Sequence, residues 1–84
     1  MIINVPPSFT TAITNTVQLD GSSYSLTIYY QIFGKRLYFK IYSGSNRLIL
    51  NSPLISGGIN NLKGYFSTST MIYSEVDSLV TILP

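Results

Sequence analysis

The fold of this chain is decided by residues 22–32, SSYSLTIYYQI. Apolar side chains fall at every second position from Tyr24 to Ile32, and most of the residues between them are polar. An alternation with a period of two is the pattern of a β-strand that buries one face. We therefore expect a strand that turns Tyr24 and its alternate neighbours toward a core and Tyr29 toward the other face.

Turn residues separate this strand from similar stretches on both sides. Asp20-Gly21 precedes it and favours a tight hairpin, because both residues tolerate positive φ. Gly34 lies in the next reversal, and Pro53 is expected to end a strand because proline cannot donate to a sheet. The same reasoning predicts further strands at residues 2–5, 11–19, 36–42, 47–50, 70–74 and 79–83.

These strands predict a mainly all-β protein with a single domain over residues 1–84. The expected architecture is a small antiparallel β-sandwich or a partly open barrel with meander connections. Apolar residues approach helical spacing only near residues 58–66, where Asn60 or Asn61 is a candidate start for one short helical turn. A plain ordered loop is the equal alternative there. Residues 79–83 are apolar on both faces, so we expect them in a sheet interior or against a neighbouring subunit.

The chain lacks the side chains that carry most enzyme chemistry. Its 84 residues include no His and no Cys, and 10% are charged whereas 45% are hydrophobic. The usual proton shuttle, the thiolate and the common ligands of transition metals are therefore missing. We expect no enzymatic activity, no cofactor and no metal site. A small domain with so few charges is expected to gain stability by packing against partners.

The remaining polar groups support catalysis or phosphate binding poorly. Glu75 and Asp77 are the only clustered carboxylates, and an acid–base pair of this kind is the enzyme alternative to a solvated turn. Gly57-Gly58 lacks the lysine of a phosphate-binding loop. The net charge is only +2, with Lys35-Arg36 as the one adjacent basic pair, so no dense cationic face is expected. Residues 1–7 do not resemble a signal peptide, and no apolar run is long enough to span a membrane.

One predicted strand face combines aromatic and basic side chains. Tyr38, Lys40 and Tyr42 alternate with the apolar residues of 36–42. This pattern is typical of aromatic packing across strands or of a protein interface, where tyrosine offers contact area with a polar tip. The alternative is a small β-barrel that binds single-stranded nucleic acid, with the rings stacking on bases. We favour the protein interface and expect no nucleic acid.

Six segments of the chain together resemble a known family, the small baseplate plug proteins of contractile-tailed bacteriophages (myoviruses). The resemblance spans nearly the whole chain. Its segments are IINVP at 2–6, VQLDG at 17–21, YSLTIYY at 24–30, LYFKIY at 37–42, PLISGGINNL at 53–62 and DSLVTIL at 77–83.

The resemblance implies a structural virion protein rather than an enzyme. Plug proteins of this family sit at the centre of the tail baseplate, beside the hub, spike and tail tube, and help to close the tube lumen. By this resemblance the chain would be made in the host cytoplasm and built into the baseplate. We expect several copies, three for example, around the tail axis.

The expected contacts with these partners lie on two parts of the chain. The first is the face with the tyrosines, and the second is the terminal strand. The candidate interface residues are Tyr29, Tyr38, Lys40, Tyr42, Leu79, Val80, Ile82 and Leu83.

Overall fold

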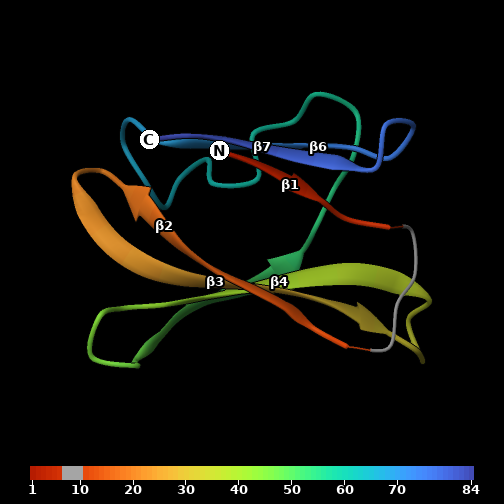
Figure 1. The fold of residues 1–84 in the computed structure, drawn as a ribbon, viewed down its shortest axis with the longest axis horizontal. Coiled ribbons are helices and arrows are strands. Elements are labelled where there is room, and N and C mark those ends of the chain that lie inside the picture. Colours follow the sequence, from red (N-terminus) through yellow and green to blue (C-terminus); the bar gives the residue numbers. More distant parts are fainter. Residues whose placement is uncertain (7–10) are drawn as a thin grey trace.

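The computed structural model describes residues 1–6 and 11–84, which form seven β-strands and no helix. Figure 1 shows the strands in two layers, with β1, β6 and β7 above and β2 to β5 below. No helix of the described residues is long and apolar enough to cross a membrane. The strands are β1 (Ile2–Asn4), β2 (Ile13–Leu19), β3 (Ser22–Gln31), β4 (Arg36–Tyr42), β5 (Leu48–Pro53), β6 (Thr70–Ser74) and β7 (Leu79–Leu83).

The larger sheet is an antiparallel meander in the order β2-β3-β4-β5. Its first hairpin turns at Asp20 and Gly21, whose φ angles are 49° and 83°, so that Leu19 pairs with Ser22. Two successive positive φ angles are the geometry that Asp-Gly favours in a two-residue hairpin loop. The expected meander is thus confirmed.

The smaller sheet has the order β1-β7-β6 and joins the two ends of the chain. Strand β7 lies in the middle, antiparallel to both neighbours, with Val80 and Ile82 on its buried side and Leu79 and Leu83 on its outer side. The backbone N–H of Val5 donates to the carbonyl of Ser78, at 2.7 Å, and so extends the contact beyond β1. The terminal strand is therefore interior to its sheet. This confirms the first of the two places that the sequence predicts for residues 79–83.

The core lies between the two sheets and takes one face from each. Phe39 is its largest fully buried side chain. Around the core, the rings of Tyr24 and Phe66 meet edge to face, with centroids 5.3 Å apart. The buried apolar residues are Ile3, Val5, Val17, Leu19, Leu26, Ile28, Leu37, Phe39, Ile41, Leu50, Leu54, Leu62, Met71, Tyr73, Val80 and Ile82.

Two separate sheets make the protein a β-sandwich and not a closed barrel. Strands β4, β6 and β7 have the predicted limits of 36–42, 70–74 and 79–83. The other four strands differ from their predicted limits: β1 ends at Asn4 and not at residue 5, and β2 begins at Ile13 and not at residue 11. Ile32 lies past the end of β3, in the turn, where it is 73% exposed. The strand predicted at 47–50 runs from Leu48 to Pro53; because β5 is an edge strand, the missing N–H of Pro53 costs no bond to a further strand.

The segment between β5 and β6 is an ordered loop without a helix. The backbone N–H of Phe66 donates to the carbonyl of Leu62, at 3.2 Å, which is one helical turn that does not continue. The side chains of Asn60 and Asn61 hold the loop in place. Asn60 Oδ1 accepts from the N–H of Met71, at 3.0 Å, and Asn61 Oδ1 accepts from the N–H of Ile55, at 2.8 Å.

A carboxylate links the two layers at one end of the sandwich. Asp20 accepts hydrogen bonds from the backbone N–H groups of Ser67, Thr68 and Ser69, at 2.7, 2.9 and 3.0 Å. The hydroxyl of Thr68 adds a fourth, and the Asp20 N–H donates to Ser69 Oγ. The bonds from Thr68, and then from Ser67, hold the pKa of the Asp20 carboxyl well below its usual range. The β2–β3 hairpin is thereby fastened to the segment that leads into β6.

Candidate protein-interaction face

The outer side of the four-stranded sheet carries a group of tyrosines that no other layer covers among residues 1–6 and 11–84. We call the outward side chains of Tyr29, Tyr38, Lys40 and Tyr42 the tyrosine face. All four alternate with buried residues on β3 and β4 and are themselves half-buried. Their exposure on the outer side confirms the predicted separation of the two strand faces. It makes these side chains available to a partner.

The tyrosine face is packed before any partner arrives. Tyr29 and Tyr38 are paired across β3 and β4, and their rings stack with centroids 5.8 Å apart. The ammonium of Lys40 lies 5.0 Å from the centre of the Tyr29 ring. The hydroxyl of Tyr29 donates to Asn51 Oδ1 on β5, at 2.9 Å. Side chains fixed in this way lose little conformational freedom on binding.

The face continues onto β5 through a residue that the sequence did not indicate. The register between β4 and β5 shifts at Ile41 and Tyr42, so that Tyr42 pairs with Leu48. Leu48 is 49% exposed and adds an apolar side chain beside the ring. The shift is a β-bulge, and a bulge changes which side chains share a face. Strict alternation along residues 47–50 therefore gave no sign of this neighbour.

The charges of the chain are distributed unevenly around this face. Strands β2 to β5 carry Arg36 and Lys40 and no carboxylate. Glu75 and Asp77 lie in the β6–β7 turn, on the other sheet, while Asp20 is bonded to the 67–69 segment. The tyrosine face is therefore weakly positive and suits a partner surface with acidic side chains.

The terminal strand offers fewer contact residues than we expected. Val80 and Ile82 were predicted to meet partners, but their exposures are 0% and 2% because they point into the sandwich core. Their contact role is therefore a wrong prediction. Leu79 and Leu83 point outward, where Leu83 is 59% exposed. These two remain available on the outer side of the three-stranded sheet.

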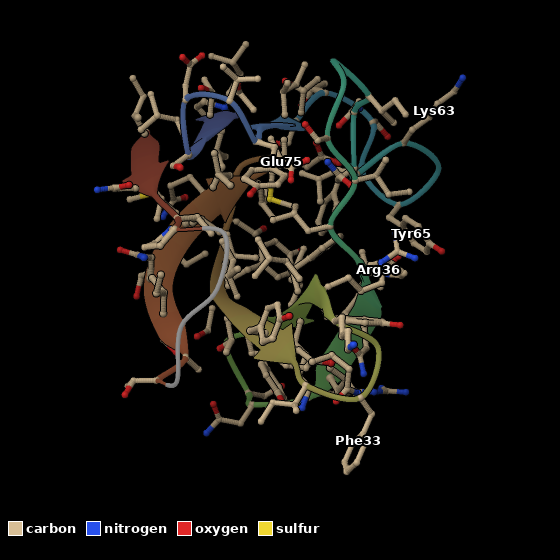
Figure 2. All side chains as sticks on the ribbon, turned by 90° about the vertical axis from the view of Figure 1, so that its right-hand side faces the viewer. Phe33, Arg36, Lys63, Tyr65 and Glu75 are labelled. Atoms are coloured by element: carbon tan, nitrogen blue, oxygen red, sulfur yellow. The ribbon has the colours of Figure 1, made fainter. Side chains whose placement is uncertain are left out.

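A hollow lies at the end of the sandwich, between the β3–β4 and β6–β7 hairpins. It has a volume of about 230 Å³ and is lined by Lys35 and Arg36 on one side and Tyr73 and Glu75 on the other. Figure 2 looks onto this end of the sandwich, with Glu75 in the upper layer, Arg36 below it at the right and Phe33 projecting at the bottom of the view. Burial, with a contribution from Glu75, raises the pKa of the Tyr73 hydroxyl.

Of the two acidic residues in the β6–β7 turn, Asp77 is bonded through its carboxylate and Glu75 through its backbone. Asp77 Oδ2 accepts from the hydroxyl of Ser74, at 3.0 Å, and the backbone N–H of Glu75 donates to Ser56 Oγ, at 3.1 Å. Within residues 1–6 and 11–84, no three side chains of the His, Cys, Asp and Glu types gather as a metal site would require. Gly57 and Gly58 adopt φ angles of 104° and 80° in a turn of the loop. The hydrogen bonds of Ser74 and Ser56 thus hold the β6–β7 turn in place.

Comparison with known proteins gives no relative from which a role is transferable. No family model matches the chain, and no curated protein or solved structure matches it either.

Proposed function

We propose that this chain is a non-catalytic assembly protein that binds a neighbouring protein through the tyrosine face. The supporting observation is the Tyr29–Tyr38 stack, held by Lys40 and Asn51 on the uncovered side of a sheet. Tyrosine is enriched at protein interfaces because it buries a large ring and keeps a polar tip. A stack that is already packed presents this area with little loss of side-chain entropy.

The setting of the proposal is the baseplate of a contractile phage tail. It rests on the six segments that resemble the baseplate plug proteins, including LYFKIY at 37–42, which carries most of the tyrosine face. The chain is a virion structural protein that packs against the hub, the spike or the tail tube and seals the central lumen. It occurs in several copies around the tail axis. The partner surface carries carboxylates opposite Lys40 and Arg36.

Single-stranded nucleic acid is the second candidate for the tyrosine face. The absence of carboxylates from strands β2 to β5 favours it. The Tyr29–Tyr38 stack argues against it, because a base that stacks on these rings must compete with their contact to one another. A titration with a fluorescent oligothymidine at low salt separates the two. Binding that weakens steeply with salt would replace the protein proposal.

The experiment for the proposed function uses contractile-tailed particles produced from the genome that encodes the chain. Quantitative mass spectrometry of purified particles should find the chain at a fixed ratio to the hub protein. Electron microscopy of particles that lack the chain should show an open or missing baseplate centre. Particles that contain none of the chain, and that assemble fully without it, would refute the assignment.

A further inference from the structure

Two open sheets have four outer strands, and most of their edges are protected against pairing with another chain. The outer strands are β1 and β6 in one sheet and β2 and β5 in the other. An outer strand exposes unpaired N–H and C=O groups along one edge, which invites a further strand. Proteins limit this by shortening, bending or covering such edges.

The edge of β6 is covered by the loop that precedes it. The N–H of Met71 donates to Asn60 Oδ1, at 3.0 Å, and its carbonyl accepts from the N–H of Asn61, at 2.8 Å. Ser56 forms a parallel bridge with Tyr73 further along the strand. These contacts use the backbone groups that an added strand would need.

The edges of β1 and β5 are limited in other ways. Strand β1 has only three residues, Ile2–Asn4, and gives a short template. Strand β5 contains the register shift opposite Ile41 and Tyr42 and ends at Pro53. A bulge and a proline are both devices that interrupt regular pairing at an edge.

Strand β2 has none of these protections. It pairs with β3 in an unbroken register over seven residues, Ile13–Leu19, with no proline and no charged residue. Among residues 1–6 and 11–84, no hydrogen bond reaches its backbone from any element except β3. An apolar groove of about 200 Å³ runs beside the strand and is lined by Met1, Thr16, Val17, Gln18, Ile82 and Pro84. The groove leaves room for the side chains of an added strand.

We propose that β2 pairs antiparallel with β2 of a second copy of this chain, about a two-fold axis at Thr16. The strand is complementary to itself in this register. Ile13 lies opposite Leu19 of the second copy, and Asn15 lies opposite Val17, all on the inner side. On the outer side Thr14 meets Gln18, and Thr16 meets Thr16 at the axis. No charge lies on the strand, so no like charges oppose one another.

This pairing joins the two four-stranded sheets into one continuous sheet. An axis perpendicular to the sheet leaves both outer sides facing the same way. The tyrosine faces of the two copies then form one surface for a partner. If the chain assembles as dimers, the number of copies around the tail axis is even. Three dimers would then take the place of three single chains. The pairing holds or fails independently of the proposed baseplate role, since it depends on β2 alone.

The test uses the full chain and a charge exchange at the axis. Sedimentation equilibrium should show dimers of the unmodified chain. Thr16→Lys and Thr16→Glu should each dissociate at a concentration at least about tenfold higher, because like charges meet at the axis. An equimolar mixture of the two variants should restore dimers, since Lys then faces Glu. Thr81→Lys, on the outer side of the other sheet, is the matched control and should dimerise as the unmodified chain does.

Three results would overturn the proposal. The first is an unmodified chain that stays monomeric at millimolar concentration. The second is a dimer that both Thr16 variants preserve, which would assign the contact to another surface. The third is a mixture of Thr16→Lys and Thr16→Glu that forms no dimers although circular dichroism shows that both variants are folded. A monomeric chain whose β2 amides become protected only with a tail protein would assign the edge to a foreign strand instead.

Discussion

Tyr29 and Tyr38 face one another across β3 and β4, with ring planes inclined by 25° and centroids 5.8 Å apart. Tyr29 also contacts the ammonium of Lys40 and donates a hydrogen bond to Asn51, which is the cross-strand partner of Lys40. A cross-strand aromatic pair of this kind stabilises a sheet, and it also shapes its outer surface. The two roles are separable by measurement.

The structural role predicts coupling between the two rings. In a double-mutant cycle of Tyr29→Ala and Tyr38→Ala, urea unfolding should give a coupling free energy of about 0.5–1 kcal/mol. Tyr29 with Tyr65, which lies in the loop before β6, is the control pair and should be additive. Additive effects for Tyr29 and Tyr38 would mean that the stack contributes nothing to stability.

The terminal strand predicts opposite outcomes for two adjacent residues. Ile82→Ala should destabilise the protein by about 2–5 kcal/mol, because the side chain is buried in the core. Leu83→Ala should change the free energy of unfolding by less than about 0.5 kcal/mol, since Leu83 points outward. Denaturant unfolding of both variants measures the difference. Equal losses would show that the core does not extend as described.

The fastening of Asp20 predicts a dependence on acid. Its folded pKa lies below the unfolded value of about 3.9, so its contribution is present above that pH and is lost as the pH falls through the folded pKa. Asp20→Asn should lower the melting temperature near neutral pH and flatten its decline below about pH 4. The measurement is the melting temperature across that range.

Asp77→Asn is the matched control for this experiment. Asp77 also lies in a hairpin turn, but it is bonded only to its own turn, through Ser74. This variant breaks no contact between the two layers, so its melting temperature near neutral pH should fall less than that of Asp20→Asn. Parallel profiles for Asp20→Asn and the unmodified chain would remove Asp20 as a link between the layers.

The asparagines of the loop predict a local effect at β6. Asn60→Ala leaves the buried N–H of Met71 without its acceptor, which should cost about 1–3 kcal/mol. In this variant the backbone amide of Met71 should exchange with deuterium faster than in the unmodified chain, whereas the amides of β4 should not, as measured by NMR. Asn46→Ala, in the exposed turn before β5, should leave that exchange unchanged. Unchanged exchange in Asn60→Ala would show that the loop does not depend on this bond.

The period-two pattern was sufficient to predict most of the sandwich. Strand β4 follows because Leu37, Phe39 and Ile41 alternate with polar or aromatic residues, and the Asp20-Gly21 turn follows from its tolerance of positive φ. Such signals are local, and they need no knowledge of the partner strand. They also placed the tyrosine face on the correct side of β3 and β4.

The parts that sequence reasoning missed depend on contacts between distant segments. Asp20 meets residues 67–69 only after both sheets have formed, and Asn60 meets Met71 only when the loop folds back. The sequence does not tell which face of residues 79–83 is buried, because Val80 and Ile82 are covered by the other sheet. Leu48 joins the tyrosine face through a bulge that no residue pattern announces.

The central claim is that the tyrosine face is the contact between this chain and a protein of the tail. The most direct measurement is the amount of chain incorporated into particles that carry the double variant Tyr38→Ala/Tyr42→Ala, with Tyr65→Ala as the matched control. The account predicts that the double variant folds, as shown by circular dichroism, yet is lost from the particles, while Tyr65→Ala is incorporated normally. A folded double variant that is incorporated as fully as the control would contradict it.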